Sequence, residues 1–205
     1  MSNKFLVFLL VAVLSAFAGV ARAQTPDLAS ALVKDTTDRM LSELKARRAE
    51  LDESPRLIYD LVSDILLPHF DFERITQSAM GRYWRKADAK QREALIGAFR
   101  QMLIRTYAKA LLNYSGQAIR MQPLRPGKRP EQVTVGTLVS EPGGPDIPID
   151  YQLYLKEDAW KVFDIVIDGI SLVANYRSSF AAQIRRGGVD GLIRTLEARN
   201  SGDDK

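Results

Sequence analysis

The clearest pattern of apolar and polar positions lies between Trp160 and Ile184. Its first half is rich in β-branched and aromatic residues, which favour a strand with side chains alternating between two faces. We expect one face to carry Phe163, Ile165 and Ile167, and the other to carry Trp160, Val162, Asp164, Val166 and Asp168. After Gly169, apolar residues recur at the four-residue spacing of a helix face, at Leu172, Tyr176, Phe180 and Ile184. A strand therefore leads directly into an amphipathic helix, and this unit needs a partner layer.

Helical patterns fill the first part of the chain. An apolar stripe predicts a helix from Pro26 to Lys45, and 47–53 is expected to be a polar link. Ser54 is a suitable N-cap and Pro55 suits the first helical position, so a second helix is expected to start there. Pro68 is expected to end that helix.

Two more helices are expected before the strands begin. Asp71 is expected to cap a short helix that Gly81 closes. Asp88 and Gln91 fit a capping box and open the longest helix, which runs to about Tyr114. Its apolar stripe is wider than one core contact requires, comprising Leu95, Ile96, Phe99, Met102, Leu103, Tyr107, Ala110, Leu111 and Tyr114. Either the helix is sandwiched or part of the stripe lines something other than protein.

Alternating apolar residues then predict strands at 119–122, 133–139, 147–156 and 160–167. The loops between them are short, which favours antiparallel pairing. Gly187 and Gly188 are expected to end the following helix, and a short final helix precedes a disordered tail at 201–205. The sequence thus predicts an α+β fold, in which helices pack on one face of a curved antiparallel sheet of about four strands and enclose an apolar cavity.

The first residues have the features of an exported leader. Lys4 precedes the apolar run 5–20, and Ala21, Arg22 and Ala23 form an A-x-A cleavage site. We therefore expect residues 1–23 to be a signal peptide and 24–200 to form a single exported domain. The chain contains no cysteine, so disulfides are excluded. The formal net charge of +4 falls when the leader is lost, and this mild balance does not indicate a nucleic-acid partner.

Candidates for catalysis are few. His69 is the one histidine, which makes neither a triad nor a typical zinc site, so we expect no metal ligands. Asp164 and Asp168 share a strand face and could act as a base if an apolar cavity raised the pKa of one of them. The alternative is structural: Asp164 pairs across the sheet and Asp168 caps the helix that follows.

Five blocks of the sequence resemble a known family. They are Leu-Leu-Pro-His-Phe-Asp-Phe at 66–72, Met-Gly-Arg-Tyr-Trp-Arg at 80–85, Phe-Arg-Gln-Met-Leu-Ile-Arg-Thr-Tyr-Ala at 99–108, the stretch 160–180, and Gly-Gly-Val-Asp-Gly-Leu-Ile at 187–193. In this order they resemble the MlaC, or toluene-tolerance, family of periplasmic phospholipid carriers. The block 160–180 is the most specific. One departure is Ala87-Asp88-Ala89, where the family often has Ser or Thr with Pro, but Asp caps equally well.

The resemblance implies a carrier without catalysis and without a cofactor, whose cargo is phospholipid. It implies that residues 24–200 are one lipid-binding domain, which acts as a monomer between two membrane complexes and preserves outer-membrane lipid asymmetry. The implied partners are an outer-membrane lipoprotein–porin complex and an inner-membrane ABC transporter with a periplasmic lipid-binding subunit. The implied fold holds the acyl chains in a cavity between helices and sheet.

Candidates for the lining of that cavity come from both layers. The long helix offers Phe99, Met102, Leu103, Tyr107 and Leu111. The sheet offers Val135, Tyr151, Leu153, Phe163, Ile165 and Ile167, and the last helix offers Val173, Tyr176 and Phe180. Each of them could equally belong to an ordinary core. The rival hypothesis is a small exported enzyme that uses Asp164 or Asp168, and Asp164→Asn separates the two because a carrier would keep its lipid.

Overall fold

The computed structural model describes residues 25–140 and 143–202. The predicted signal peptide at 1–23 and the end of the predicted tail at 203–205 lie outside these ranges. The last helix runs through Ser201 and Gly202, so the first two residues of the predicted tail are helical. A search of the helices in the described ranges finds none with the length and apolarity of a bilayer-spanning segment.

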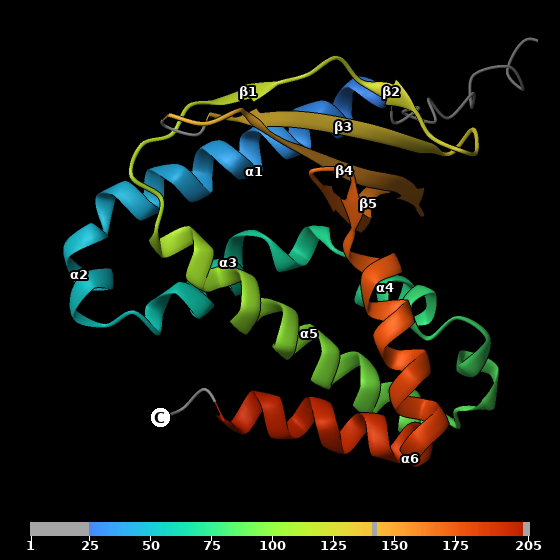
Figure 1. Cartoon of the computed structure of the whole chain (residues 1–205). Coiled ribbons are helices and arrows are strands. Elements are labelled where there is room, and N and C mark those ends of the chain that lie inside the picture. Colours follow the sequence, from blue (N-terminus) through green and yellow to red (C-terminus); the bar gives the residue numbers. More distant parts are fainter. Residues whose placement is uncertain (1–24, 141–142, 203–205) are drawn as a thin grey trace, which may run out of the picture.

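An antiparallel sheet forms one layer of the molecule and the helices form the other (Figure 1). The helical elements are α1 (Pro26–Ala46), α2 (Arg48–Glu53), α3 (Leu57–Ile65), η1 (Leu67–His69), α4 (Phe72–Met80), η2 (Gly81–Lys86), α5 (Ala89–Leu112) and α6 (Leu172–Gly202). The strands are β1 (Ile119–Met121), β2 (Arg125–Pro126), β3 (Gln132–Val139), β4 (Ile147–Lys156), β5 (Ala159–Ile167) and β6 (Ile170–Ser171). The α+β class is confirmed.

The sheet is larger than the sequence predicts. Its order is β1-β3-β4-β5-β6, and β2 pairs with β3 on the same side as β1. The four predicted strands are present, but β2 and β6 were not predicted. Each of these two strands has only two residues, which is too short for an alternating pattern to be recognised.

The helix signals that depend on local capping are confirmed at two positions. The Asp71 carboxylate accepts a hydrogen bond from the Arg74 backbone N–H and begins α4, which ends at Gly81 with a positive φ of 54°. Asp88 and Gln91 form the predicted capping box of α5. Both signals rest on contacts within one helical turn, so sequence spacing suffices to predict them.

Two predictions between α1 and α3 are wrong. Residues 48–53 form the short helix α2, because Leu51 is buried in a cluster with α1 and α3. Ser54 does not cap α3 with its side chain. Its backbone carbonyl accepts from the Leu57 N–H, and α3 begins two residues after Pro55. The apolar contact of Leu51 outweighs the polar composition that surrounds it.

A β-bulge in β5 corrects the predicted strand faces. Gln152 pairs with Asp164 while the next residue, Leu153, pairs with Val162, so Phe163 is an extra residue on β5. The bulge reverses the alternation. Trp160 and Val162 therefore share a face with Ile165 and Ile167, and Phe163 does not.

The glycine pair Gly187-Gly188 divides α6 into two helical segments that meet at a kink. Gly188 has a φ of 67° and a ψ of −173°, which is a conformation that glycine adopts readily. The two halves of α6 pack against α4 and α5 (Figure 1). The prediction of a helix end here is thus confirmed as a kink between two helical segments.

The buried residues form three clusters rather than one core. The first joins α4, η2, α5 and α6, and the second joins α1, α2, α3 and the end of α5. The third lies between the start of α1 and one face of the sheet. Space that none of the three clusters fills lies between the helices and the sheet, and this space contains the candidate site.

Candidate functional site

A first pocket, called the central pocket here, lies among α3, α4, α5, β5 and the start of α6. It has a volume of about 290 Å³. Its lining is almost entirely aliphatic and aromatic, comprising Val62, Leu66, Leu67, Phe70, Phe72, Ile75, Leu103, Ile104, Tyr107, Ala108, Ala110, Leu111, Ile149, Tyr151, Asp164, Ile165, Ile167, Leu172 and Val173. A surface of this kind favours an apolar ligand over a charged one.

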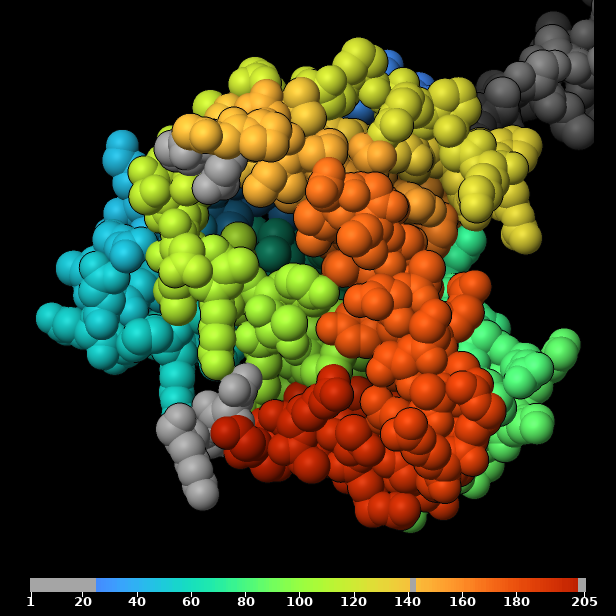
Figure 2. Space-filling model, in the orientation of Figure 1, coloured from blue at the N-terminus to red at the C-terminus, as the bar shows by residue number. Residues whose placement is uncertain are grey.

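A second pocket, called the α1 pocket, lies between α1, the end of α5 and the sheet, and has a volume of about 640 Å³. It adds polar side chains to the apolar wall, namely Thr36, Thr37, His69, Asn113 and Gln117. The surface is hollowed where the end of α5, in green, faces the strands drawn in orange (Figure 2). A lining that combines apolar and polar side chains suits an amphipathic ligand.

The two pockets are neighbours with a common wall. Both are lined by Leu66, Phe70, Ala110, Leu111, Ile149, Tyr151 and Ile165. These residues come from the η1 region, from α5 and from β4 and β5, so both layers contribute to the wall. A ligand with two long apolar parts could occupy both pockets at once.

Part of the predicted lining set does face these pockets. The residues that line at least one of them are Leu103, Tyr107, Leu111, Tyr151, Ile165, Ile167 and Val173. They lie on the second half of α5, on β4 and β5, and at the start of α6. Their contact with a ligand remains a prediction.

The other predicted residues line neither pocket. Phe99, Met102, Tyr176 and Phe180 belong to the cluster between α4, α5 and α6, where the rings of Phe99 and Phe180 meet at 4.8 Å. Val135 and Leu153 are fully buried beneath α1. Phe163 is displaced by the bulge and packs against Tyr154, 5.8 Å between ring centroids. The stripe of α5 therefore splits along its length: the first half is core and the second half lines the pocket.

Sequence reasoning missed several lining residues, above all Phe70 and Phe72. They flank the N-cap Asp71, and all three belong to the block 66–72. Alternation along an extended segment places Phe70 and Phe72 on the side opposite to Asp71, which was the available signal. Ile149 was missed as well, although it lies two residues from Tyr151 on the same strand face.

Asp164 is the carboxylate of the central pocket, and its oxygens already have partners. They accept from the Ser171 hydroxyl at 2.5 Å and from the Val173 backbone N–H at 3.1 Å. Asp164 thus caps the start of α6, which is the role the structural alternative gave to Asp168. Asp168 is exposed in the β5–β6 turn with a φ of 49°. Neither acid has the free, pocket-facing geometry of a general base.

Three other ionisable groups in or beside the pockets, Tyr151, Tyr176 and His69, are uncharged at neutral pH. Burial raises the pKa of the Tyr151 hydroxyl, and burial followed by the hydrogen bond with Tyr107 raises the pKa of Tyr176. The pKa of His69 is lowered, first by burial and then by Lys161 and Arg39. Within the described residues, no group of three or more His, Asp or Glu side chains could hold a metal ion.

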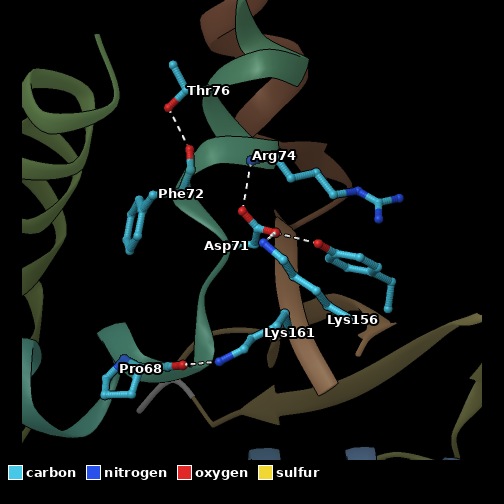
Figure 3. A network of polar contacts seen from close by, with 8 residues as sticks. Pro68, Asp71, Phe72, Arg74, Thr76, Lys156 and Lys161 are labelled. Atoms are coloured by element: carbon cyan, nitrogen blue, oxygen red, sulfur yellow. Dashed lines mark hydrogen bonds and ion pairs between the residues drawn. The ribbon is translucent and has the colours of Figure 1, made fainter. Parts of the chain in front are cut away.

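A polar joint connects the helices to the sheet beside the pockets (Figure 3). Asp71, 7 % exposed, accepts from Tyr154 Oη and from Lys156 Nζ at 2.9 Å, in addition to capping α4. The Asp71 N–H donates to the Val162 carbonyl at 3.0 Å. Burial alone would raise the pKa of Asp71, but the hydrogen bonds from Tyr154, the Arg74 N–H and Lys156 lower it overall. The joint fixes the segment that carries Phe70 and Phe72.

Comparison with known proteins finds relatives over most of the chain. A family model described as MlaC protein matches residues 34–198. Toluene tolerance protein ttg2D of Pseudomonas putida is 33% identical over 178 residues, which cover 85% of this chain and 80% of that protein. The intermembrane phospholipid transport system binding protein MlaC of Haemophilus influenzae is 24% identical over 192 residues, covering 92% of this chain and 90% of that one.

A solved structure extends the comparison to three dimensions. It is that of a phospholipid-binding protein from Ralstonia solanacearum in complex with a phospholipid. The TM-score is 0.78 and the sequence identity 36%, with 86% of this chain and 99% of that chain covered. The similarity therefore includes both the sheet and the helical layer.

Proposed function

The chain belongs to the MlaC family, and from this membership we propose that it binds a phospholipid and carries it between membranes. The observation that supports this most directly is the pair of apolar pockets between the two layers, which share one wall. The relative from R. solanacearum, with the same fold, is described in complex with a phospholipid. The acyl chains would occupy the pockets, and the headgroup would stay at the opening near the polar side chains of the α1 pocket.

The energetics of lipid transfer require pockets of this kind. Two acyl chains hold about 30 methylenes, and exposing them to water costs on the order of 24 kcal/mol at about 0.8 kcal/mol each. Only an apolar, water-excluding lining can offset that cost. Asp164, which caps α6, and the uncharged His69 bring no unpaired charge into the lining.

The proposal includes the place and the partners that the resemblance implies. The predicted leader would direct the protein to the periplasm, where it would act as a monomer. It would exchange lipid with an outer-membrane lipoprotein–porin complex and with an inner-membrane ABC transporter that has a periplasmic lipid-binding subunit. The name of the relative from H. influenzae, an intermembrane phospholipid transport system binding protein, supports this assignment.

Native mass spectrometry of the mature protein, purified without detergent from the periplasm, tests the proposal. We expect extra mass that matches phospholipid, with the lipid identified after extraction. A clean ligand-free mass, together with no uptake from phospholipid vesicles in the presence of the inner-membrane complex, would contradict the carrier function.

Asp164→Asn separates a carrier from an enzyme. The amide oxygen can still accept from the Val173 N–H, so we expect a loss of no more than about 1 kcal/mol in the free energy of unfolding. Bound lipid per protein, measured by mass spectrometry, should stay within twofold of the wild-type amount. A folded Asp164→Asn variant that has lost its lipid would count against acyl chains in the central pocket.

A further inference from the structure

Building on the proposed function, we propose that Phe70 separates two acyl-chain compartments and thereby limits the length of the chains that the protein can bury. Phe70 is part of the lining of both the central pocket and the α1 pocket. It also packs against two of the three buried clusters, the one among α4, α5 and α6 and the one beneath the sheet. Its ring therefore lies where the two pockets meet.

The backbone around Phe70 is anchored to the sheet on both sides. Phe70 forms a parallel bridge with Val162, and the Asp71 N–H donates to the Val162 carbonyl. On the preceding side, Lys161 Nζ donates to the Pro68 carbonyl at 2.6 Å (Figure 3). Because Pro68 and Asp71, on either side of Phe70, are both hydrogen-bonded to β5, the backbone that carries the Phe70 ring is held against the sheet.

The neighbouring aromatic residue, Phe72, stacks on the Phe70 ring but belongs to only one of the two pockets. Phe72 lines the central pocket but not the α1 pocket, and the rings of Phe70 and Phe72 stack at 5.9 Å with 23° between their planes. Figure 3 shows Phe72 and Asp71 pointing to opposite sides of the segment. Phe70 and Phe72 thus face the pockets, while the Asp71 side chain lies on the opposite side of the segment and fixes it through hydrogen bonds. Phe70 is the member of the pair that touches both compartments.

Removing the Phe70 ring should join the compartments. Phe70→Ala deletes six carbon atoms from the common wall and leaves room for about as many chain carbons. A methylene that is buried equally well in the membrane and in the protein does not change the free energy of lipid transfer between them. Each methylene that the protein cannot bury lowers the bound amount about fourfold relative to the membrane. The chain lengths that the protein prefers therefore measure how many methylenes its pockets can bury.

In the experiment, the delipidated protein is incubated with phospholipids of increasing chain length. Vesicles contain equal amounts of phosphatidylglycerols with monounsaturated chains of about 14 to about 24 carbons, and native mass spectrometry gives the bound amount of each. For the wild type, we expect the bound amount to fall steeply beyond a limiting length. Phe70→Ala should move that limit by at least about two carbons, which raises the bound amount of the first excluded lipid more than about tenfold.

Two matched variants distinguish a specific role of Phe70 between the two pockets from a general effect of removing a phenyl ring. Phe163→Ala removes the same ring from β5, outside both pockets, and should keep the wild-type limit. Phe72→Ala enlarges the central pocket alone and should move the limit less than Phe70→Ala. If Phe70→Ala does not fold, Phe70→Leu provides a smaller opening with the same expected direction.

Three results would overturn the role of Phe70: a wild type without a limiting length, equal limits for wild type and Phe70→Ala, or equal shifts for Phe70→Ala and Phe72→Ala. None of them affects the carrier function, because the wild type binds lipid in each case. A wild type that binds no phosphatidylglycerol of any length would contradict the proposed function itself.

Discussion

Asp71→Ala is expected to lower the free energy of unfolding by about 3 kcal/mol, measured by urea denaturation at about pH 7. The Asp71 carboxylate is buried and has three partners, the Arg74 N–H, Tyr154 Oη and Lys156 Nζ. Loss of the cap of α4 accounts for about 1 kcal/mol. The buried Tyr154 hydroxyl, left without an acceptor, adds about 2 kcal/mol. Lys156 is half-exposed and adds little.

Asp88→Ala is the matched control for this prediction. Asp88 also caps a helix, but it is exposed and serves only the capping box of α5. Its loss should cost about 1 kcal/mol. Equal losses for Asp71→Ala and Asp88→Ala would mean that Asp71 acts as a cap and not as the joint between helices and sheet.

The contribution of the Asp71 carboxylate to the free energy of unfolding should decrease at low pH. The pKa of Asp71 is lowered from its ordinary value of 3.8, because its hydrogen bonds outweigh the effect of burial. Stability from such a group is fully present above the unfolded pKa and is lost as the pH falls through the folded pKa. The difference between wild type and Asp71→Asn should stay constant from about pH 7 to about pH 5 and narrow below about pH 4. Narrowing between about pH 7 and pH 6 would contradict this assignment.

Local signals in the sequence account for most of the fold. The caps at Asp71 and Asp88 and the alternation of β3 and β4 were predictable because each depends on neighbours within a few residues. The family resemblance added what the pattern cannot supply, which is the expectation of a ligand between the layers. The structure has two pockets between the layers, and the second half of α5 contributes to the lining of both.

The lining was only partly predictable, because it depends on which distant elements meet. Phe99 and Leu103 lie on the same stripe of α5, yet α6 covers Phe99 and leaves Leu103 facing the central pocket. The bulge at Phe163 depends on the pairing of β4 with β5, and one inserted residue exchanges the two faces. Phe70 owes its position to a bridge with Val162, 92 residues along the chain, which no local pattern encodes.

Leu111→Glu is expected to reduce bound phospholipid at least about a hundredfold, as measured by native mass spectrometry of protein purified without detergent. Leu111 lines both pockets and lies in their common wall. A carboxylate among acyl chains costs about 3 kcal/mol, which corresponds to a hundredfold in affinity. Without lipid, the same carboxylate faces a pocket that water can enter. The variant should therefore lose much less free energy of unfolding than free energy of lipid binding.

Leu28→Glu adds the same charge at a position of α1 that lines neither pocket, and it should keep the wild-type lipid content because Leu28 is 42 % exposed. Leu111→Ala separates charge from volume, since it enlarges the wall without placing a charge among the chains, and it should retain lipid. Circular dichroism and urea denaturation establish that each variant is folded before its lipid is counted. If folded Leu111→Glu carried as much phospholipid as Leu28→Glu, the acyl chains would have to lie elsewhere, because no hydrocarbon could pass an ionised side chain in the shared wall at that affinity.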